Sequence, residues 1–98
     1  MNLEQLKKFK SQILELAEAN KALNIRVFGS VSREQANEDS DIDFVIDVGE
    51  SQNLIDFIKL KQELGDLLGQ EVDLASSTGL RKGIRESILK DAIPITSL

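Results

Sequence analysis

Residues 41–48 carry a two-residue repeat that constrains the fold more than any other feature of the chain. One set of alternating positions is apolar: Ile42, Phe44, Ile46 and Val48. The other set holds three carboxylates and one valine: Asp41, Asp43, Asp47 and Val45. Because successive side chains of a β-strand point to opposite faces of a sheet, the repeat predicts a strand with one buried face. The opposite face of that strand carries the carboxylates.

Helical periodicity predicts the elements that cover this strand. Apolar residues recur every three or four positions over residues 3–20 and again over residues 54–68. Asn2 is a candidate N-cap of the first helix, and Gly69 follows the end of the second. A last helix is predicted from residue 80 to about residue 90.

Two short strands complete the predicted sheet. Residues 25–28 and 71–75 are short runs of strand-forming residues, and Pro94 either closes the last helix or opens an extended terminal piece. The predicted order is helix, strand, strand, helix, strand, helix. This order indicates a single α/β (α+β) domain over residues 1–98, with helices packed on a small mixed β-sheet.

Composition excludes several kinds of chemistry. The chain has no His and no Cys, which removes imidazole bases, thiol nucleophiles and zinc sites of the Cys/His kind. A net charge of −5 lacks the basic footprint of a protein that binds nucleic acid or an anionic membrane directly. No apolar run approaches the roughly 20 residues of a membrane span, so we expect a soluble cytoplasmic protein. Carboxylates are left as the candidate bases and metal ligands.

The negative charge is concentrated in the middle of the chain, where residues 33–50 hold seven acidic residues and one basic residue. Asp41 and Asp43 are expected about 7 Å apart on one face of their strand, given the usual rise per residue. Two such charges need water, a basic partner or a cation beside them, and carboxylate oxygens suit Mg²⁺. If the strand with Asp73 neighbours theirs, a two-metal centre becomes possible. Solvated residues on an open sheet face are the alternative.

A calcium loop is a second interpretation of the same acids. Counted from Asp39, an EF-hand pattern of acids falls at positions three, five, nine and twelve: Asp41, Asp43, Asp47 and Glu50. Position six of such a loop requires Gly for its sharp turn, but Phe44 stands there inside a run that favours a strand. The pattern therefore argues against an EF-hand.

The Gly29-Ser30 pair stands directly after the first predicted strand. Glycine lets the backbone approach a ligand closely, and Ser30 adds a hydroxyl and an N–H where a helical turn begins, which favours phosphate. Taken alone, such a pair after a strand is usually just a turn.

Together these pieces resemble the nucleotidyltransferase superfamily related to DNA polymerase β. The resemblance is carried by Gly29-Ser30, by Asp41-Ile42-Asp43 ten residues later, and by Asp73 on a later strand. Residues 28–33 (FGSVSR) and 39–46 (DSDIDFVI), and the C-terminal part from residue 72, are similar to the minimal nucleotidyltransferases. These minimal nucleotidyltransferases, abbreviated MNT, are encoded beside toxins that have a HEPN domain.

The resemblance implies a metal-dependent transfer of a nucleotide. Asp41, Asp43 and Asp73 would hold two Mg²⁺ ions at the triphosphate of ATP. Gly29 and Ser30 would cradle the β- and γ-phosphates. Asp73 would also draw the proton from an acceptor hydroxyl, which attacks the α-phosphorus as pyrophosphate leaves.

Two residues near the phosphate loop are less defined by the resemblance. Arg33 would contact phosphate or simply cover the loop. Many family members have Ala-Arg-Gly where residues 32–34 read Ser-Arg-Glu, so Glu34 places a negative charge near the phosphates. The carboxylate set itself is intact.

The resemblance also implies an acceptor. Since the chain leaves no residues for an acceptor-holding domain, the acceptor is expected on a partner, a Tyr near the active site of a HEPN ribonuclease toxin. The chain would then be an antitoxin that silences the toxin with AMP. One alternative is a non-catalytic antitoxin that neutralises the toxin by binding alone. Another is transfer to a small-molecule alcohol, which the small size disfavours.

Overall fold

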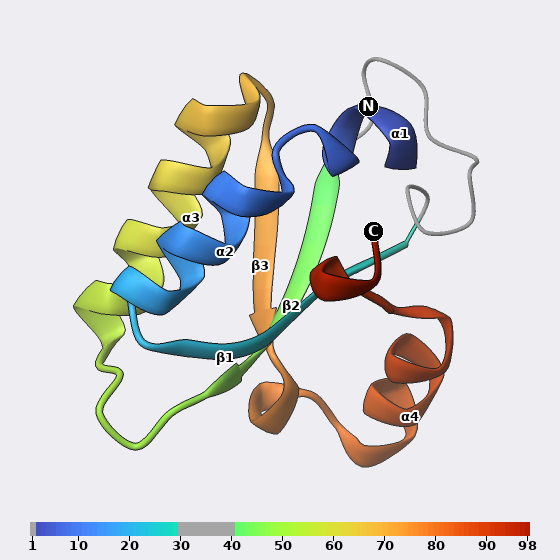
Figure 1. Ribbon diagram of the computed structural model, residues 1–98. Helices are drawn as coiled ribbons and strands as arrows, with labels where there is room; N and C mark the ends of the chain where they lie inside the picture. Colours follow the sequence, from blue (N-terminus) through green and yellow to red (C-terminus); the bar gives the residue numbers. More distant parts are fainter. Residues whose placement is uncertain (1, 30–40) are drawn as a thin grey trace.

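The computed structural model describes residues 2–29 and 41–98, which form a four-stranded sheet in the order β3-β2-β1-β4 (Figure 1). Its strands are β1 (Ala22–Phe28), β2 (Ile42–Val48), β3 (Val72–Ser76) and β4 (Ile93–Pro94). The central strand β2 runs antiparallel to β1 and parallel to β3, while β4 pairs antiparallel with β1. The prediction of a small mixed sheet is confirmed. Pro94 does not close the last helix, which ends at Asp91, and it lies at the end of the terminal extended piece rather than at its opening.

The helices are α1 (Leu3–Lys7), α2 (Lys10–Ala19), α3 (Leu54–Leu68) and α4 (Lys82–Asp91), with short 3₁₀ turns η1 (Ser77–Gly79) and η2 (Ile95–Ser97). α3 provides the crossover that joins the parallel strands β2 and β3. α2 and α3 lie side by side on the sheet, whereas α4 stands apart from them (Figure 1). Among the described residues, no helix combines the length and the apolar character that a membrane span requires.

The hydrophobic core lies between the sheet and the pair α2 and α3. Ile42, Phe44 and Ile46 are fully buried in it, as the two-residue repeat predicts. Val45, on the opposite face of β2, is also fully buried, so that face is open only in part. Core side chains from the helices include Ile13, Leu60 and Leu64.

β1 begins three residues before its predicted start. A bulge between Leu23 and Arg26 interrupts the pairing with β2, and Asn24 within it has a positive φ of 48°. The extra residue lets both Ala22 and Ile25 reach the buried face. The bulge breaks the two-residue repeat, which is why the repeat marks only the second half of the strand.

The single helix predicted over residues 3–20 is wrong, because the chain breaks it between α1 and α2. The N–H groups of Lys8 and Phe9 donate to carbonyls only three residues earlier, a tighter turn than an α-helix. No Gly or Pro marks the break. Instead, Lys10 beyond it donates from Nζ to the carbonyl oxygens of Thr96 and Leu98, both at 3.0 Å.

The predicted limits of α3 are confirmed and those of α4 are shifted. The Asn53 side chain accepts from the Asp56 N–H at 2.9 Å and caps α3, and Gly69 ends it with a left-handed φ of 66°. α4 begins at Lys82 because Ser76 Oγ accepts from the Gly79 N–H and forms η1 first. Leu80 is therefore extended.

Candidate active site

Asp43 and Asp73 lie side by side at the beginning of the parallel strands β2 and β3. The two residues are register partners, and Phe28 at the end of β1 is the partner of Asp43 on the other side. Residues paired across neighbouring strands point to the same face, with their backbones roughly 5 Å apart. The expectation that the Asp73 strand neighbours the Asp43 strand is therefore confirmed. The sheet brings together two acids that are 30 residues apart in the sequence.

Asp41 directly precedes β2 and is exposed. It lies two residues before Asp43, so the strand geometry directs both side chains to the same face. The charge of Asp41 therefore acts on Asp43, and Asp43 is the residue that both other predicted carboxylates influence.

The surroundings of Asp43 disfavour its negative charge. Burial raises the pKa of Asp43 to about 6, and the neighbouring Asp73 charge, a hydrogen bond with Asp73 and the Asp41 charge add to the increase. A carboxylate crowded in this way is stabilised by a cation beside it. Burial and the neighbouring acids therefore both act against the negative charge of Asp43.

Gly29 makes room for Asp43. It follows β1 with a left-handed φ of 74°, and a Cβ at this position would stand 2.6 Å from Asp43 Oδ2. Any side chain would collide with the carboxylate as well as strain the backbone. The sequence predicts a close backbone approach at Gly29, and the structure gives Asp43 as one partner of that approach. Ser30, Arg33 and Glu34 lie outside the described residues.

The donor set fits Mg²⁺ as a partial site. Within residues 2–29 and 41–98, no cluster of three or more acidic, His or Cys side chains forms a ready-made metal cage. Mg²⁺ does not need such a cage, because it takes one or two protein carboxylates and fills its shell with water and substrate phosphates. Asp43 and Asp73 are register partners and would be the pair of hard oxygen ligands for such an ion.

Asp47 shares the strand and the face of Asp43 but has its own partners. It accepts hydrogen bonds from Asn24 at 2.8 Å, from Arg26 at 3.2 Å and from the Ser77 hydroxyl. Burial of Asp47 works to raise its pKa, but the hydrogen bonds from Arg26, Ser77 and Asn24 outweigh it and lower the pKa to about 2. Asp47 therefore ties β1, β2 and η1 together.

Since residues 42–48 form a strand, the argument against a calcium loop is confirmed.

A cleft of about 330 Å³ adjoins Asp43. Phe28, Gly29 and Asp43 line one side of it, and α4 lines the other with Ser87, Ile88 and Asp91. Sequence reasoning missed this helical wall, because nothing in the spacing of α4 residues indicates which strand they face. The contribution of α4 depends on tertiary packing alone.

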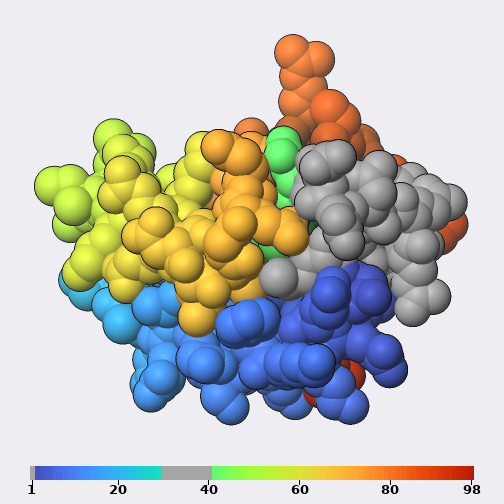
Figure 2. Space-filling model, turned by 90° about the horizontal axis from the view of Figure 1, so that it is seen from above, coloured from blue at the N-terminus to red at the C-terminus, as the bar shows by residue number. Residues whose placement is uncertain are grey.

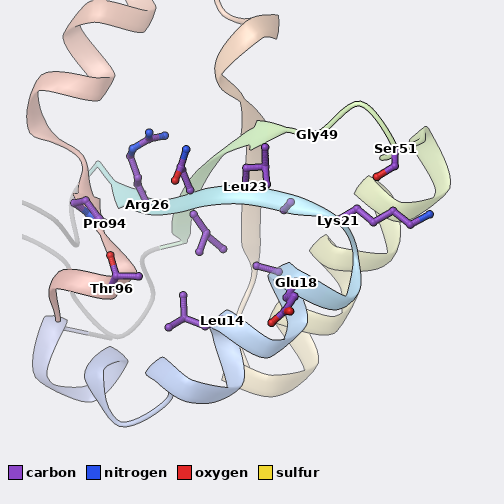
Figure 3. A pocket seen from close by; sticks show the side chains of 13 residues that line it. Leu14, Glu18, Lys21, Leu23, Arg26, Gly49, Ser51, Pro94 and Thr96 are labelled. Carbon is purple, nitrogen blue, oxygen red and sulfur yellow. The ribbon is translucent and has the colours of Figure 1, made fainter.

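A larger cavity of about 530 Å³ lies elsewhere, along the edge of β1 between α2, β4 and the loop after β2. Leu14, Lys21, Arg26 and Thr96 are among the residues around it (Figure 3). None of the three candidate carboxylates lines it. Its size alone gives it no chemistry, so the smaller cleft at Asp43 is the better candidate active site.

Residues 4–98 match the family described as polymerase β, nucleotidyltransferase. The chain therefore belongs to the polymerase β nucleotidyltransferase family. It is 40% identical over 79 residues to protein adenylyltransferase MntA of Thermococcus cleftensis, which covers 81% of this chain and 80% of that relative. It is 30% identical over 95 residues to a candidate protein adenylyltransferase of Methanocaldococcus jannaschii, which covers 97% of this chain and 99% of the relative.

Solved structures give the same fold. A candidate minimal nucleotidyltransferase superposes with a TM-score of 0.88 at 42% identity, covering 96% of both chains. A toxin-antitoxin with AMP-PNP matches at a TM-score of 0.75 and 24% identity, covering 88% of this chain and 71% of that one. A complex of a tri-AMPylated Shewanella oneidensis HEPN toxin with an MNT antitoxin matches at a TM-score of 0.68 and 23% identity. The match covers 95% of this chain and 71% of that one. At these lower identities the likeness concerns the fold alone.

Proposed function

We propose that this chain is a protein adenylyltransferase that moves AMP from ATP to a tyrosine hydroxyl of a HEPN ribonuclease toxin and thereby silences the toxin. The observation that carries the proposal is the placement of Asp43 beside Asp73, with Gly29 against Asp43, in a chain of this family. Its similarity to protein adenylyltransferase MntA supports transfer to a protein. The toxin-antitoxin complexes that share its fold support the choice of partner and of an adenine nucleotide.

Asp41, Asp43 and Asp73 are the residues we assign to Mg²⁺, two ions in the loaded site. When bound, Mg²⁺ neutralises the charge that builds up on the triphosphate and on departing pyrophosphate. The crowding of Asp43 by Asp73 and by burial supports this assignment, because a cation removes the repulsion that raises the Asp43 pKa.

Asp73 is the residue we assign as general base. It is exposed beside Asp43, so an acceptor from another protein can reach it. The chain has no His, and a carboxylate must take this role. The phenol oxygen forms a bond to the α-phosphorus, the bond between that phosphorus and the pyrophosphate oxygen breaks, and the phenol proton goes to Asp73. We assign Gly29 and Ser30 to the phosphates of ATP, with Arg33 as a phosphate contact or a cover of the loop.

The proposal is tested with the protein encoded by the neighbouring gene, which the proposal expects to be the HEPN partner, together with ATP and Mg²⁺. Intact-mass spectrometry of the HEPN protein is expected to detect AMP adducts with the unsubstituted chain and none with Asp43→Asn. Asp66→Asn, a change at an exposed position of α3, is the matched control and is expected to transfer normally.

Ribonuclease activity of the HEPN protein is measured in the same samples. Full neutralisation by an Asp41→Asn/Asp43→Asn variant, with no adduct in any sample, would overturn the enzymatic proposal. The antitoxin would then act by binding alone.

A further inference from the structure

One stripe of α4 borders the candidate active site and is left without cover by the rest of the described chain. Ile84, Ser87, Ile88 and Asp91 stand at helical spacings of three, one and three, which place them on one side of the helix. The last three line the cleft that contains Asp43 and Gly29. Ile84 lies on the same side of α4, one turn closer to the start of the helix, and is 50% exposed.

α4 packs on the protein through the adjoining side, which shares Ile88 with the cleft-lining side. Arg85, Ile88 and Leu89 are half-buried, whereas Ile84, Ser87 and Asp91 are exposed. No residue of α4 is fully buried. The orange segment that leads into α4 also projects from the molecular surface (Figure 2). We call Ile84, Ser87 and Asp91 the α4 stripe.

The charge of the α4 stripe favours a donor or cation over a phosphate. Asp91 is the last residue of α4, where the helix presents its carbonyl end and a partial negative charge. Asp91 and Asp43 line the same cleft. A phosphate placed against Asp91 would be repelled, whereas a hydroxyl or a basic side chain would be attracted. Ile84 adds a single exposed apolar side chain beside the cleft, which an apolar group of a partner can cover.

We infer that the α4 stripe docks the segment of the protein partner that carries the acceptor hydroxyl, with an apolar side chain on Ile84 and a basic one at Asp91. This inference rests on the proposed function. It adds to that function the surface that brings the acceptor to the cleft. The continuity of the stripe with the Asp43 cleft means that a segment bound there lies beside the reacting atoms.

The test measures binding of the HEPN protein encoded beside this chain, without ATP, to two stripe variants. Ile84→Asp and Asp91→Lys are each expected to weaken binding at least about tenfold, since each removes a central contact of the interface. Leu23→Asp on β1 and Asp66→Lys on α3 are the matched controls, since Leu23 is 53% exposed, close to the 50% of Ile84. Both controls are expected to bind within about twofold of the unsubstituted chain.

Binding of ATP with Mg²⁺ to the chain alone is the second readout. Ile84→Asp is expected to keep its nucleotide affinity within about twofold, because the inference gives Ile84 no nucleotide contact. Loss of nucleotide affinity with unchanged partner binding would overturn the inference and assign the stripe to the nucleotide. Stripe variants that bind the partner as the controls do would overturn it as well.

The binding and transfer measurements distinguish a failure of the inference from a failure of the proposed function. AMP transfer at normal rates by the stripe variants would overturn the inference and leave the function intact. Stripe-dependent binding without any AMP transfer would overturn the proposed function and leave the stripe as a docking surface for the HEPN protein alone. If the unsubstituted chain does not bind the HEPN protein, both are wrong.

Discussion

Replacing Gly29 by alanine tests whether the backbone at the end of β1 is shaped to fit Asp43. The new Cβ would stand 2.6 Å from Asp43 Oδ2, against about 3.4 Å for ordinary contact, so the carboxylate must move by about 0.8 Å. A displacement near 1 Å in a reacting group can lower activity by about 100-fold, so we expect a loss of up to that size with Gly29→Ala. The left-handed φ of 74° adds a cost of about 1–2 kcal/mol in stability.

Gly69→Ala is the matched control for this change. Gly69 has a similar φ of 66°, but a Cβ there meets nothing within 4 Å. We expect the same loss of about 1–2 kcal/mol in the free energy of unfolding, with AMP transfer unchanged. Backbone strain is thereby separated from the collision with Asp43.

Two assays on each variant decide the outcome. Urea unfolding gives the stability change, and the rate of AMP transfer to the HEPN protein gives activity. The reasoning predicts equal destabilisation of the two variants and a loss of transfer with Gly29→Ala alone. Equal transfer rates in the two variants would refute it.

Three further changes test the fold. Asp47→Asn should lower the free energy of unfolding at pH 7 by about 1–2 kcal/mol, since the lowered pKa of Asp47 stabilises the folded state. That stabilisation is full above pH 4 and is lost as the pH falls towards 2, so urea unfolding should find the two proteins converging there. Asn53→Ala removes the cap of α3 and should cost about 1 kcal/mol, measured as a lower melting temperature. Gly83→Ala, with nothing within 4 Å of the new Cβ, should stabilise α4 by up to about 1 kcal/mol in the same assay.

The positions of the three carboxylates could be predicted because strands leave a strong local signal. The two-residue repeat around Asp43 and the shorter one around Asp73 each identify a strand and the face it turns outward. The parallel register that makes Asp43 and Asp73 neighbours is seen only in the structure. The α/β class therefore follows from local periodicity, whereas the candidate site is predicted from the family resemblance.

The parts that could not be predicted depend on contacts between distant residues. No Gly or Pro marks the break between α1 and α2. The contact beside the break, from Lys10 to the carbonyl oxygens of Thr96 and Leu98, joins opposite ends of the chain. The bulge at Asn24 lies where β1 pairs with β2. The hydrogen bonds of Asp47 join β1, β2 and η1. The α4 wall of the cleft is invisible for the same reason, since a helix pattern does not say what the helix faces.

The most direct measurement of the central claim uses ATP labelled at either the α- or the γ-phosphate, with Mg²⁺, the chain and the HEPN protein encoded beside it. The α-label is expected on the HEPN protein and the γ-label in pyrophosphate. Asp43→Asn should abolish both the labelling of the HEPN protein and the release of pyrophosphate. Label on the HEPN protein from the γ-phosphate, or equal α-labelling with Asp43→Asn, would contradict AMP transfer by the Asp43 and Asp73 site.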